Sequence, residues 1–178
     1  MKRIFLIFIL LFVSINHGTA ISEKTTIYVV RHAEKDLADS KNADPDLSED
    51  GYSRAEALSE KLKAQSIAVI FSTNYKRTKQ TALPLARNNG LDIVSYEGRN
   101  YTDLKEAVNK NYKNKKVLIV GHSNTVLEIV KAFGAVPPVS SLTEEDYDFL
   151  FELRIDRLSK VKLITRRYGK EHHTTDLK

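Results

Sequence analysis

The chain has 178 residues, of which 42% are hydrophobic and 29% are charged. This composition is typical of a single globular domain and excludes a fibrous or disordered chain. The formal net charge is +5 and cysteine is absent, which excludes disulfides, thiolate metal sites and cysteine nucleophiles.

The first twenty residues have the pattern of a secretory signal peptide. Two basic residues precede an apolar run over 4–13, and small residues occupy 18–20. Because this run is shorter than the ~20 apolar residues of a spanning helix, we predict cleavage after Ala20 and not a membrane anchor. Residues 21–178 would then form one domain with net charge +3. We expect it to be exported, periplasmic or secreted, and free of the membrane after removal of the signal.

Basic residues gather in two stretches, 113–116 and 166–170. Neither stretch interleaves aromatic residues with its charges in the way of a nucleic-acid motif. We therefore interpret both as solvated faces and expect no nucleic-acid partner.

Strands and helices alternate along the first three quarters of the chain. Segments that are apolar and β-branched on both faces predict buried strands at 25–31, 67–71 and 117–120, and a further strand is predicted at 91–95. Each is followed by a segment with helical spacing of its apolar residues. The helices are expected after the N-cap Ser48, after the cap-type residues 72–74, over 101–112 and after 121–124. Residues 33–46 are polar and predict a loop.

The C-terminal part changes to strand-like alternation. Residues 149–155 and 160–165 alternate apolar and polar side chains around a short loop, which predicts a hairpin. The fold class is therefore α/β: a three-layer αβα sandwich whose mostly parallel sheet has an antiparallel C-terminal hairpin at its edge. Residues 169–178 are predicted to be a mobile tail that adds nothing to the core.

Two histidines follow buried strands directly. His32 comes after Arg31 at the end of the first strand, and His122 follows the fourth strand. Arg77 lies in the first turn of the helix after the second strand. Ligands of such sheets bind beyond the carboxyl ends of the parallel strands, so these four side chains are expected to share one crevice.

At this point the sequence resembles the histidine phosphatase superfamily, with its phosphoglycerate mutase-like fold. The matching motifs follow the family's order over about residues 25–133. They are Arg31-His32-Ala33-Glu34, Leu47-Ser48 with Gly51 and Ala55, Ser72-Thr73 with Arg77, Thr78 and Thr81, and Gly121-His122-Ser123. The short chain resembles the compact branch of the family, here in an exported form. The resemblance implies a metal-independent phosphoric monoester hydrolase.

The residue types suit phosphoryl transfer. Arg31 and Arg77 offer forked donors that match a phosphate dianion. His32 is the predicted nucleophile, because an imidazole with a reference pKa near 6.5 is largely neutral and can form a phosphohistidine. His122, at the start of a helix, would donate to the transferring oxygens while helix amides add positive potential.

The proton donor for the leaving group is a separate question. Family members that have such an acid carry it after the third strand, where this chain has Glu97, and some compact members lack it. Glu97 is therefore the predicted acid, a plain surface acid being the alternative, with Glu34 and Asp103 in reserve. The histidines at 172–173 are expected to be solvated and without function.

A metal site is the chemical alternative at the same crevice. It would combine the two histidines with Glu34 and Asp36, but two arginines nearby would repel a cation. We therefore expect no metal and no other cofactor.

The leading interpretation is hydrolysis of a phosphate monoester on a small molecule or a peptide. The alternatives are a non-catalytic phosphate-binding module, a phosphatase for protein phosphohistidine, and a phosphatase for sugar phosphates of the cell envelope. The substrate depends on the loops at 33–46 and 134–147 and does not follow from the sequence, and neither does the oligomeric state.

Overall fold

The computed structural model describes residues 24–176. The predicted cleavage site after Ala20 lies outside these residues. No helix between residues 24 and 176 has the length and apolar character needed to cross a membrane.

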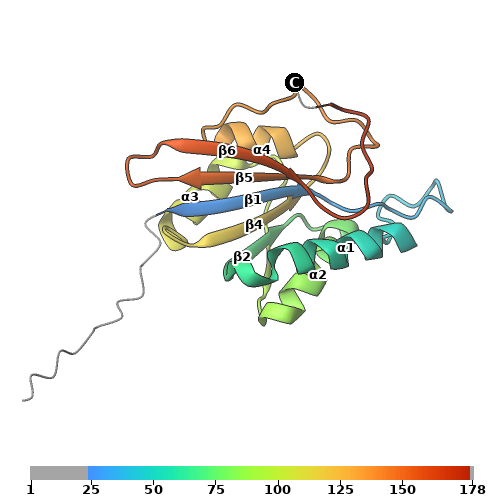
Figure 1. The fold of residues 1–178 in the computed structure, drawn as a ribbon. Coiled ribbons are helices and arrows are strands. Elements are labelled where there is room, and N and C mark those ends of the chain that lie inside the picture. Colours follow the sequence, from blue (N-terminus) through green and yellow to red (C-terminus); the bar gives the residue numbers. More distant parts are fainter. Residues whose placement is uncertain (1–23, 177–178) are drawn as a thin grey trace, which may run out of the picture.

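Six strands form one sheet in the order β3-β2-β4-β1-β5-β6. β1 pairs with β4, β4 with β2 and β2 with β3 in parallel, whereas β5 is antiparallel to both β1 and β6. The predicted sheet, mostly parallel with the C-terminal hairpin at its edge, is confirmed (Figure 1). The strands are β1 (Thr25–Arg31), β2 (Ile67–Ser72), β3 (Ile93–Ser95), β4 (Lys116–Gly121), β5 (Phe149–Ile155) and β6 (Val161–Arg167).

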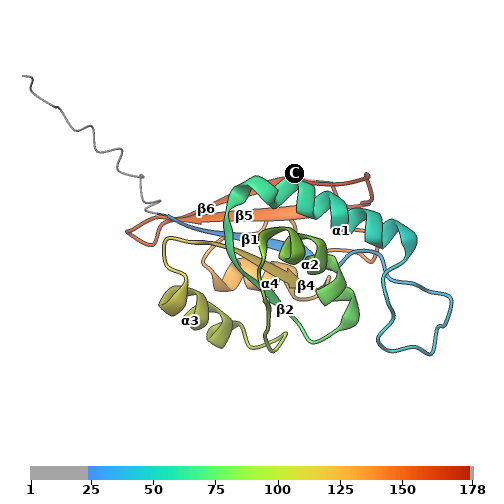
Figure 2. The ribbon, with the colours of Figure 1, turned by 90° about the horizontal axis from the view of Figure 1, so that it is seen from below.

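Helices cover both faces of this sheet, which makes three layers (Figures 1 and 2). α1 and α2 pack on one face over Tyr28 and Val30 of β1, and α3 and α4 pack on the other over Ile27 and Val29. All residues of β1 are consequently buried, as expected for a strand without a polar face. The helices are α1 (Glu49–Leu62), α2 (Lys76–Asn89), α3 (Tyr101–Asn111) and α4 (Val126–Ala132), with a short 3₁₀ turn, η1, at Lys63–Gln65.

The ends of α2 differ in detail from the prediction. The cap-type residues 72–74 do not cap it; the carboxylate of Asp44, in the loop after β1, accepts a hydrogen bond from the Lys76 amide at 3.0 Å. At the other end Gly90 takes a left-handed conformation and the Leu91 amide donates to a carbonyl of the helix. β3 therefore begins at Ile93, two residues later than predicted.

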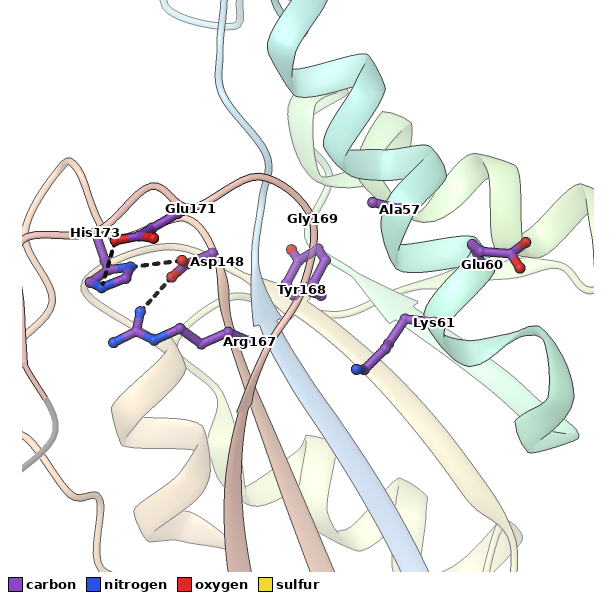
Figure 3. A pocket seen from close by; sticks show the side chains of 9 residues that line it. All are labelled: Ala57, Glu60, Lys61, Asp148, Arg167, Tyr168, Gly169, Glu171 and His173. Carbon is purple, nitrogen blue, oxygen red and sulfur yellow. Dashed lines mark hydrogen bonds and ion pairs between the residues drawn. The ribbon is translucent and has the colours of Figure 1, made fainter.

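The C-terminal tail is held against the body of the molecule, where the sequence predicts a segment that adds nothing to the core. Asp146 is fully buried and accepts hydrogen bonds from two amides and a hydroxyl of the tail. Asp148, also buried, is bonded by Arg167 of β6 and by His173 (Figure 3). Buried carboxylates need donors, and the tail over 169–176 supplies them. His173 is accordingly a partner of Asp148 and not a solvated side chain.

The basic stretch at 166–170 faces acids of the neighbouring strand. Arg166 donates to Glu152 and Arg167 to Asp148, and both carboxylates are almost inaccessible. These arginines therefore neutralise buried carboxylates of the hairpin.

Candidate active site

The carboxyl ends of β1, β2 and β4 open into a cavity of about 930 Å³. His32 and His122 face each other there, with ring centroids 5.3 Å apart in an edge-to-face arrangement. A hydrogen bond of 2.9 Å from the His32 amide to the Gly121 carbonyl joins the two strand ends. Arg77 and Glu97 line the same cavity, together with Lys35, Thr73, Asn74, Tyr75, Tyr96, Gly98, Arg99, Ser123, Asn124, Thr125 and Glu144.

His32 is buried and oriented by the backbone. Its Nδ1 lies 2.7 Å from the carbonyl oxygen of Ala33. Because a carbonyl only accepts, Nδ1 carries the proton and Nε2 keeps its lone pair. The Ala33 amide is fixed in turn by the hydroxyl of Thr81 on α2, at 2.8 Å. The segment that follows β1 thus presents a neutral imidazole with one basic nitrogen.

The surroundings keep His32 uncharged. Burial lowers its pKa well below the usual value. The hydrogen bond to the Ala33 carbonyl acts in the opposite direction, whereas the nearby Arg31, His122 and Arg77 side chains lower the pKa further. A neutral imidazole is the form that can act as a nucleophile. That His32 is the nucleophile stays a prediction.

His122 is engaged at both ring nitrogens. Its Nε2 lies 2.9 Å from the hydroxyl of Thr73, and its Nδ1 lies 3.5 Å from a terminal nitrogen of Arg77. Burial lowers the pKa of His122 to about 4, and the charges of Arg77 and Arg31 contribute in the same direction. In this state His122 is neutral and accepts from Arg77, whereas the sequence predicts a donor to the transferring oxygens.

The turn before α4 also differs from the prediction. The amides of Thr125 and Val126 donate to the carbonyl of His122, so these two amides are not available to a phosphoryl group in this structure. Gly121 is needed for close packing, because a Cβ there would lie 2.9 Å from the Thr125 hydroxyl oxygen and 3.3 Å from that of Tyr96. The glycine thus makes room for the side chains of Thr125 and Tyr96.

Arg77 lies in the first turn of α2, as predicted. Its guanidinium stacks on the ring of Tyr75 at 4.3 Å and lies 3.6 Å from the carboxylate of Asp44. The same Tyr75 ring meets His122 edge-on, with centroids 5.2 Å apart. Tyr75, which the sequence does not single out, therefore holds Arg77 and His122 side by side.

Arg31 is almost fully buried, and the chain itself occupies its terminal nitrogens. One of them donates to the carbonyls of Thr143 and Glu144, each at 2.9 Å, and the other to the Glu144 carboxylate at 2.8 Å. The guanidinium also stacks on Tyr147 at 3.9 Å. The sequence predicts a fork open to phosphate, but a buried guanidinium needs acceptors, and the segment before β5 provides them.

The Glu144 carboxylate bridges two elements at the cavity. Its second oxygen accepts from the Ser123 hydroxyl at 2.9 Å, and its side chain is 69% exposed. Partial burial would raise the pKa of Glu144, but the Ser123 hydrogen bond and the charges of Arg31 and Lys35 outweigh this effect and lower it. The ionised Glu144 carboxylate thus accepts from Arg31 and Ser123, two donors that would also suit a phosphoryl group. Glu144 lies in a loop expected to shape the site, although nothing in the sequence marks it individually.

The three predicted acids occupy different surroundings. Glu97 is exposed and lines the cavity. Asp103 is exposed at the start of α3, where it is bonded to the cap residue Asn100. Glu34 is paired with buried Arg54, whose Nε lies 2.8 and 2.9 Å from its two oxygens. Of the three, Glu97 is the one at the cavity.

Arg54, which nothing in the sequence marks, forms a buried ion pair with Glu34, which we call the wall behind the cleft. Besides Glu34 it donates to the carbonyls of Tyr168 and Lys170. α1 reaches this position only because Gly51 has no side chain, since a Cβ there would lie 2.1 Å from the Glu34 carbonyl oxygen. The wall therefore joins α1, the segment after β1 and the start of the tail.

The carboxylates of the alternative metal site do not converge on the histidines. Glu34 is turned to Arg54, and the Asp36 carboxylate accepts from the Ala38 amide in an exposed turn. Within the described part of the chain, no three histidine, aspartate or glutamate side chains form a group that could hold a metal ion.

Comparisons with known proteins agree with this geometry. The sequence model of the histidine phosphatase superfamily (branch 1) matches residues 27–100, which include His32 and Arg77. Phosphoserine phosphatase 1 of Hydrogenobacter thermophilus is 36% identical over 72 residues, which are 38% of this chain and 34% of that protein. The alignment thus spans about a third of this curated relative.

Solved structures share the fold over most of the chain. A mycobacterial glucosyl-3-phosphoglycerate phosphatase superposes with a TM-score of 0.65 at 15% identity, covering 82% of this chain and 100% of that one. A protein described as a putative phosphohistidine phosphatase SixA from Agrobacterium tumefaciens has a TM-score of 0.61 at 24% identity, covering 82% and 98%.

Proposed function

We propose that the chain is a member of the histidine phosphatase superfamily, whose sequence model matches residues 27–100, and that it hydrolyses phosphate monoesters through a phosphohistidine on His32. One observation carries the proposal: Nδ1 of His32 is bonded to a carbonyl, and its neutral, basic Nε2 remains in a cleft with Arg77 and a second histidine. A buried imidazole with this orientation and no carboxylate partner suits nucleophilic attack on a dianion.

The reaction has two steps. Nε2 of His32 forms a bond to phosphorus while the ester P–O bond breaks, and the leaving oxygen takes a proton. Water then attacks phosphorus, the N–P bond breaks and inorganic phosphate leaves. Arg77 stabilises the charge on the equatorial oxygens in both steps, because its guanidinium carries a fixed positive charge with terminal donors beside His32.

Arg31 joins the phosphoryl site by exchange of its anion. The phosphoryl group replaces the Glu144 carboxylate on the terminal nitrogen that Glu144 now occupies, while the backbone carbonyls keep the other nitrogen in place. The exposure of the Glu144 side chain permits this movement without disturbing the backbone.

Glu97 is proposed as the acid that protonates the leaving group. A Glu97→Gln variant should slow turnover of alkyl phosphates much more than that of nitrophenyl phosphate, because an activated leaving group needs little protonation. Equal losses on both substrates would remove Glu97 from this role and direct the search to other groups at the cavity.

We propose that the reaction needs no metal ion, since arginine and histidine side chains supply the positive charge that a metal supplies elsewhere. EDTA should leave turnover unchanged. Loss of activity on chelation, restored by a divalent ion, would contradict this.

The direct test is a panel of phosphate esters with the purified protein and a His32→Ala control. It should include sugar phosphates, phosphoserine and a phosphohistidine peptide, because similar proteins are named for such substrates. Turnover of any ester that depends on His32 supports the proposal. Binding of phosphate without turnover of any substrate would favour the non-catalytic module.

Export is proposed from the sequence of the first twenty residues. Amino-terminal sequencing of the protein from the producing cell should begin at Ile21, and an intact Met1 in the membrane fraction would contradict cleavage.

A further inference from the structure

Thr73 and Thr78 form a buried hydroxyl pair behind His122. Both side chains are almost inaccessible, and their hydroxyl oxygens are 3.0 Å apart. Thr73 contacts Nε2 of His122 at 2.9 Å, and Thr78 reaches the carbonyls of Thr73 and Tyr75 at 3.0 and 2.9 Å. The mechanism above uses neither hydroxyl.

The direction of these hydrogen bonds follows from Arg77. A guanidinium only donates, so Nδ1 of His122, which faces Arg77, must be the unprotonated nitrogen. Nε2 then carries the proton and donates to Thr73. The Thr73 hydroxyl therefore donates to Thr78, and Thr78 donates to a backbone carbonyl, where the chain of hydrogen bonds ends.

The opposite direction would place like groups against each other. If Thr73 donated to Nε2, the proton of a neutral His122 would sit on Nδ1 and point at the N–H groups of Arg77. Two donors facing each other in a partly buried site leave one of them unsatisfied, at a cost of about 1–3 kcal/mol.

We propose that Thr73, backed by Thr78, is a positioning residue that fixes His122 with its basic Nδ1 toward Arg77, and that a phosphoryl dianion binds together with one proton at that nitrogen. The inference rests on the proposed function, because it assumes a phosphoryl group beside Arg77. Only a protonated Nδ1 can donate to a phosphoryl oxygen, and Nε2 already has its partner.

The charges around His122 make this uptake depend on the ligand. Arg77 and Arg31 face the ring and oppose a second proton, Glu144 favours it, and His32 lies opposite as a neutral ring. A dianion between the arginines offsets their charge and therefore favours the proton on Nδ1. Phosphate and proton should thus bind cooperatively.

Nitrogen-15 NMR of the histidine rings reads the first half of the proposal without any ligand. The free protein at pH 7 should show His122 neutral, with the proton on Nε2. Saturating inorganic phosphate should convert both ring nitrogens to the protonated form. A proton on Nδ1 in the free protein, or an unchanged neutral ring with phosphate bound, would overturn the inference.

The pH dependence gives a second readout. Where phosphate is a dianion and free His122 is neutral, uptake of one proton makes the affinity fall as the pH rises, by up to about tenfold per pH unit. A constant affinity for the dianion would contradict proton uptake. Failure to bind phosphate at any pH would instead count against the proposed function, because the tautomer of the free protein is measured independently.

Variants of Thr73 separate positioning from folding. Thr73→Val leaves Nε2–H without an acceptor, so phosphate affinity should fall about tenfold and its dependence on pH should flatten. Thr73→Ser keeps the hydroxyl and should recover both. Ser59→Ala removes a buried hydroxyl of α1 that accepts from Asn88 and takes no part in this chain of hydrogen bonds, so it should leave the pH dependence as in the parent protein. A Thr73→Val protein with the parent's affinity and pH dependence would show that Thr73 has no such role.

Discussion

Two buried arginines are paired with glutamates in two neighbouring regions of the molecule. In the wall behind the cleft, the side chains of Arg54 and Glu34 are 2% and 12% exposed. At the rim, Arg31 is 1% exposed but its partner Glu144 is 69% exposed. An exposed carboxylate returns to water at little cost, whereas separating a buried pair leaves uncompensated charges inside the protein. The pair in the wall should therefore stay together, whereas the pair at the rim is the one that we propose exchanges its carboxylate for a phosphoryl group.

The largest expected effect is on the wall. Arg54→Ala leaves the Glu34 carboxylate and two backbone carbonyls without donors, and it should lower the free energy of unfolding by about 3–5 kcal/mol. Urea denaturation measures this. The exposed Arg87 of α2 serves as a control, since Arg87→Ala should change stability by less than about 0.5 kcal/mol. A loss below about 1 kcal/mol for Arg54→Ala would mean that the Arg54–Glu34 pair does not hold these segments together.

Replacement of Arg77 should reduce turnover and leave stability nearly unchanged, unlike replacement of Arg54. Arg77→Ala is expected to reduce kcat/KM by about a hundredfold to a thousandfold, because donors to the equatorial oxygens are lost. The free energy of unfolding of the Arg77→Ala protein should change little. Lys76→Ala, at the adjacent exposed position, is the matched control. A decrease below about threefold for Arg77→Ala would exclude Arg77 from the phosphoryl site.

Asp146, which anchors the tail and the segment beneath Arg31, gives a pH-dependent prediction. Burial would raise its pKa, but hydrogen bonds from the Thr175 hydroxyl and from the amides of residues 143, 174 and 175 outweigh this effect and lower it. A depressed pKa stabilises the fold above the unfolded value of about 3.9, and this contribution is lost as the pH falls through the folded value. Asp146→Asn should therefore cost about 2 kcal/mol at pH 7 and progressively less below about pH 4.

Denaturation at pH 7 and pH 3 measures that difference, with Asp39→Asn, at an exposed turn, as the control. The same loss at both pH values would show that the charge of Asp146 is unimportant.

The smallest effect concerns the exchangeable anion. Glu144→Gln removes a negative charge that competes with phosphate for Arg31, so inorganic phosphate should inhibit about three- to fivefold more strongly, ~1 kcal/mol for an exposed pair. Steady-state inhibition measures this, and Glu145→Gln controls for net charge. Weaker inhibition in the Glu144→Gln protein would mean that Glu144 assists phosphate binding.

The features that the sequence predicts correctly are those that depend on local pattern. Buried strands, the Ser48 cap and the position of His32 and His122 at strand ends follow from apolar periodicity and from the rule that ligands bind beyond parallel strand ends. What it misses depends on contacts between distant segments. Arg31 meets Glu144 113 positions away, and Arg54 meets the Tyr168 carbonyl 114 positions away. No spacing in the sequence signals such pairs.

The roles within the site were less predictable than its location. The sequence places Arg31 and His122 as donors to phosphate, yet in this structure both have internal partners. Burial explains the difference, because a polar group removed from water takes whatever acceptor or donor the fold offers. Local pattern therefore locates the residues, and the surrounding partners decide their resting state.

In the proposed mechanism, Nε2 of His32 takes the phosphoryl group. Rapid quenching during turnover, followed by digestion under alkaline conditions and mass spectrometry, tests it most directly, since phosphohistidine is labile in acid and survives in base. We expect one phosphoryl group on His32 and none on the His32→Ala protein. A phosphoryl group on His122, Ser72 or Ser123, or full turnover by the His32→Ala protein, would contradict it.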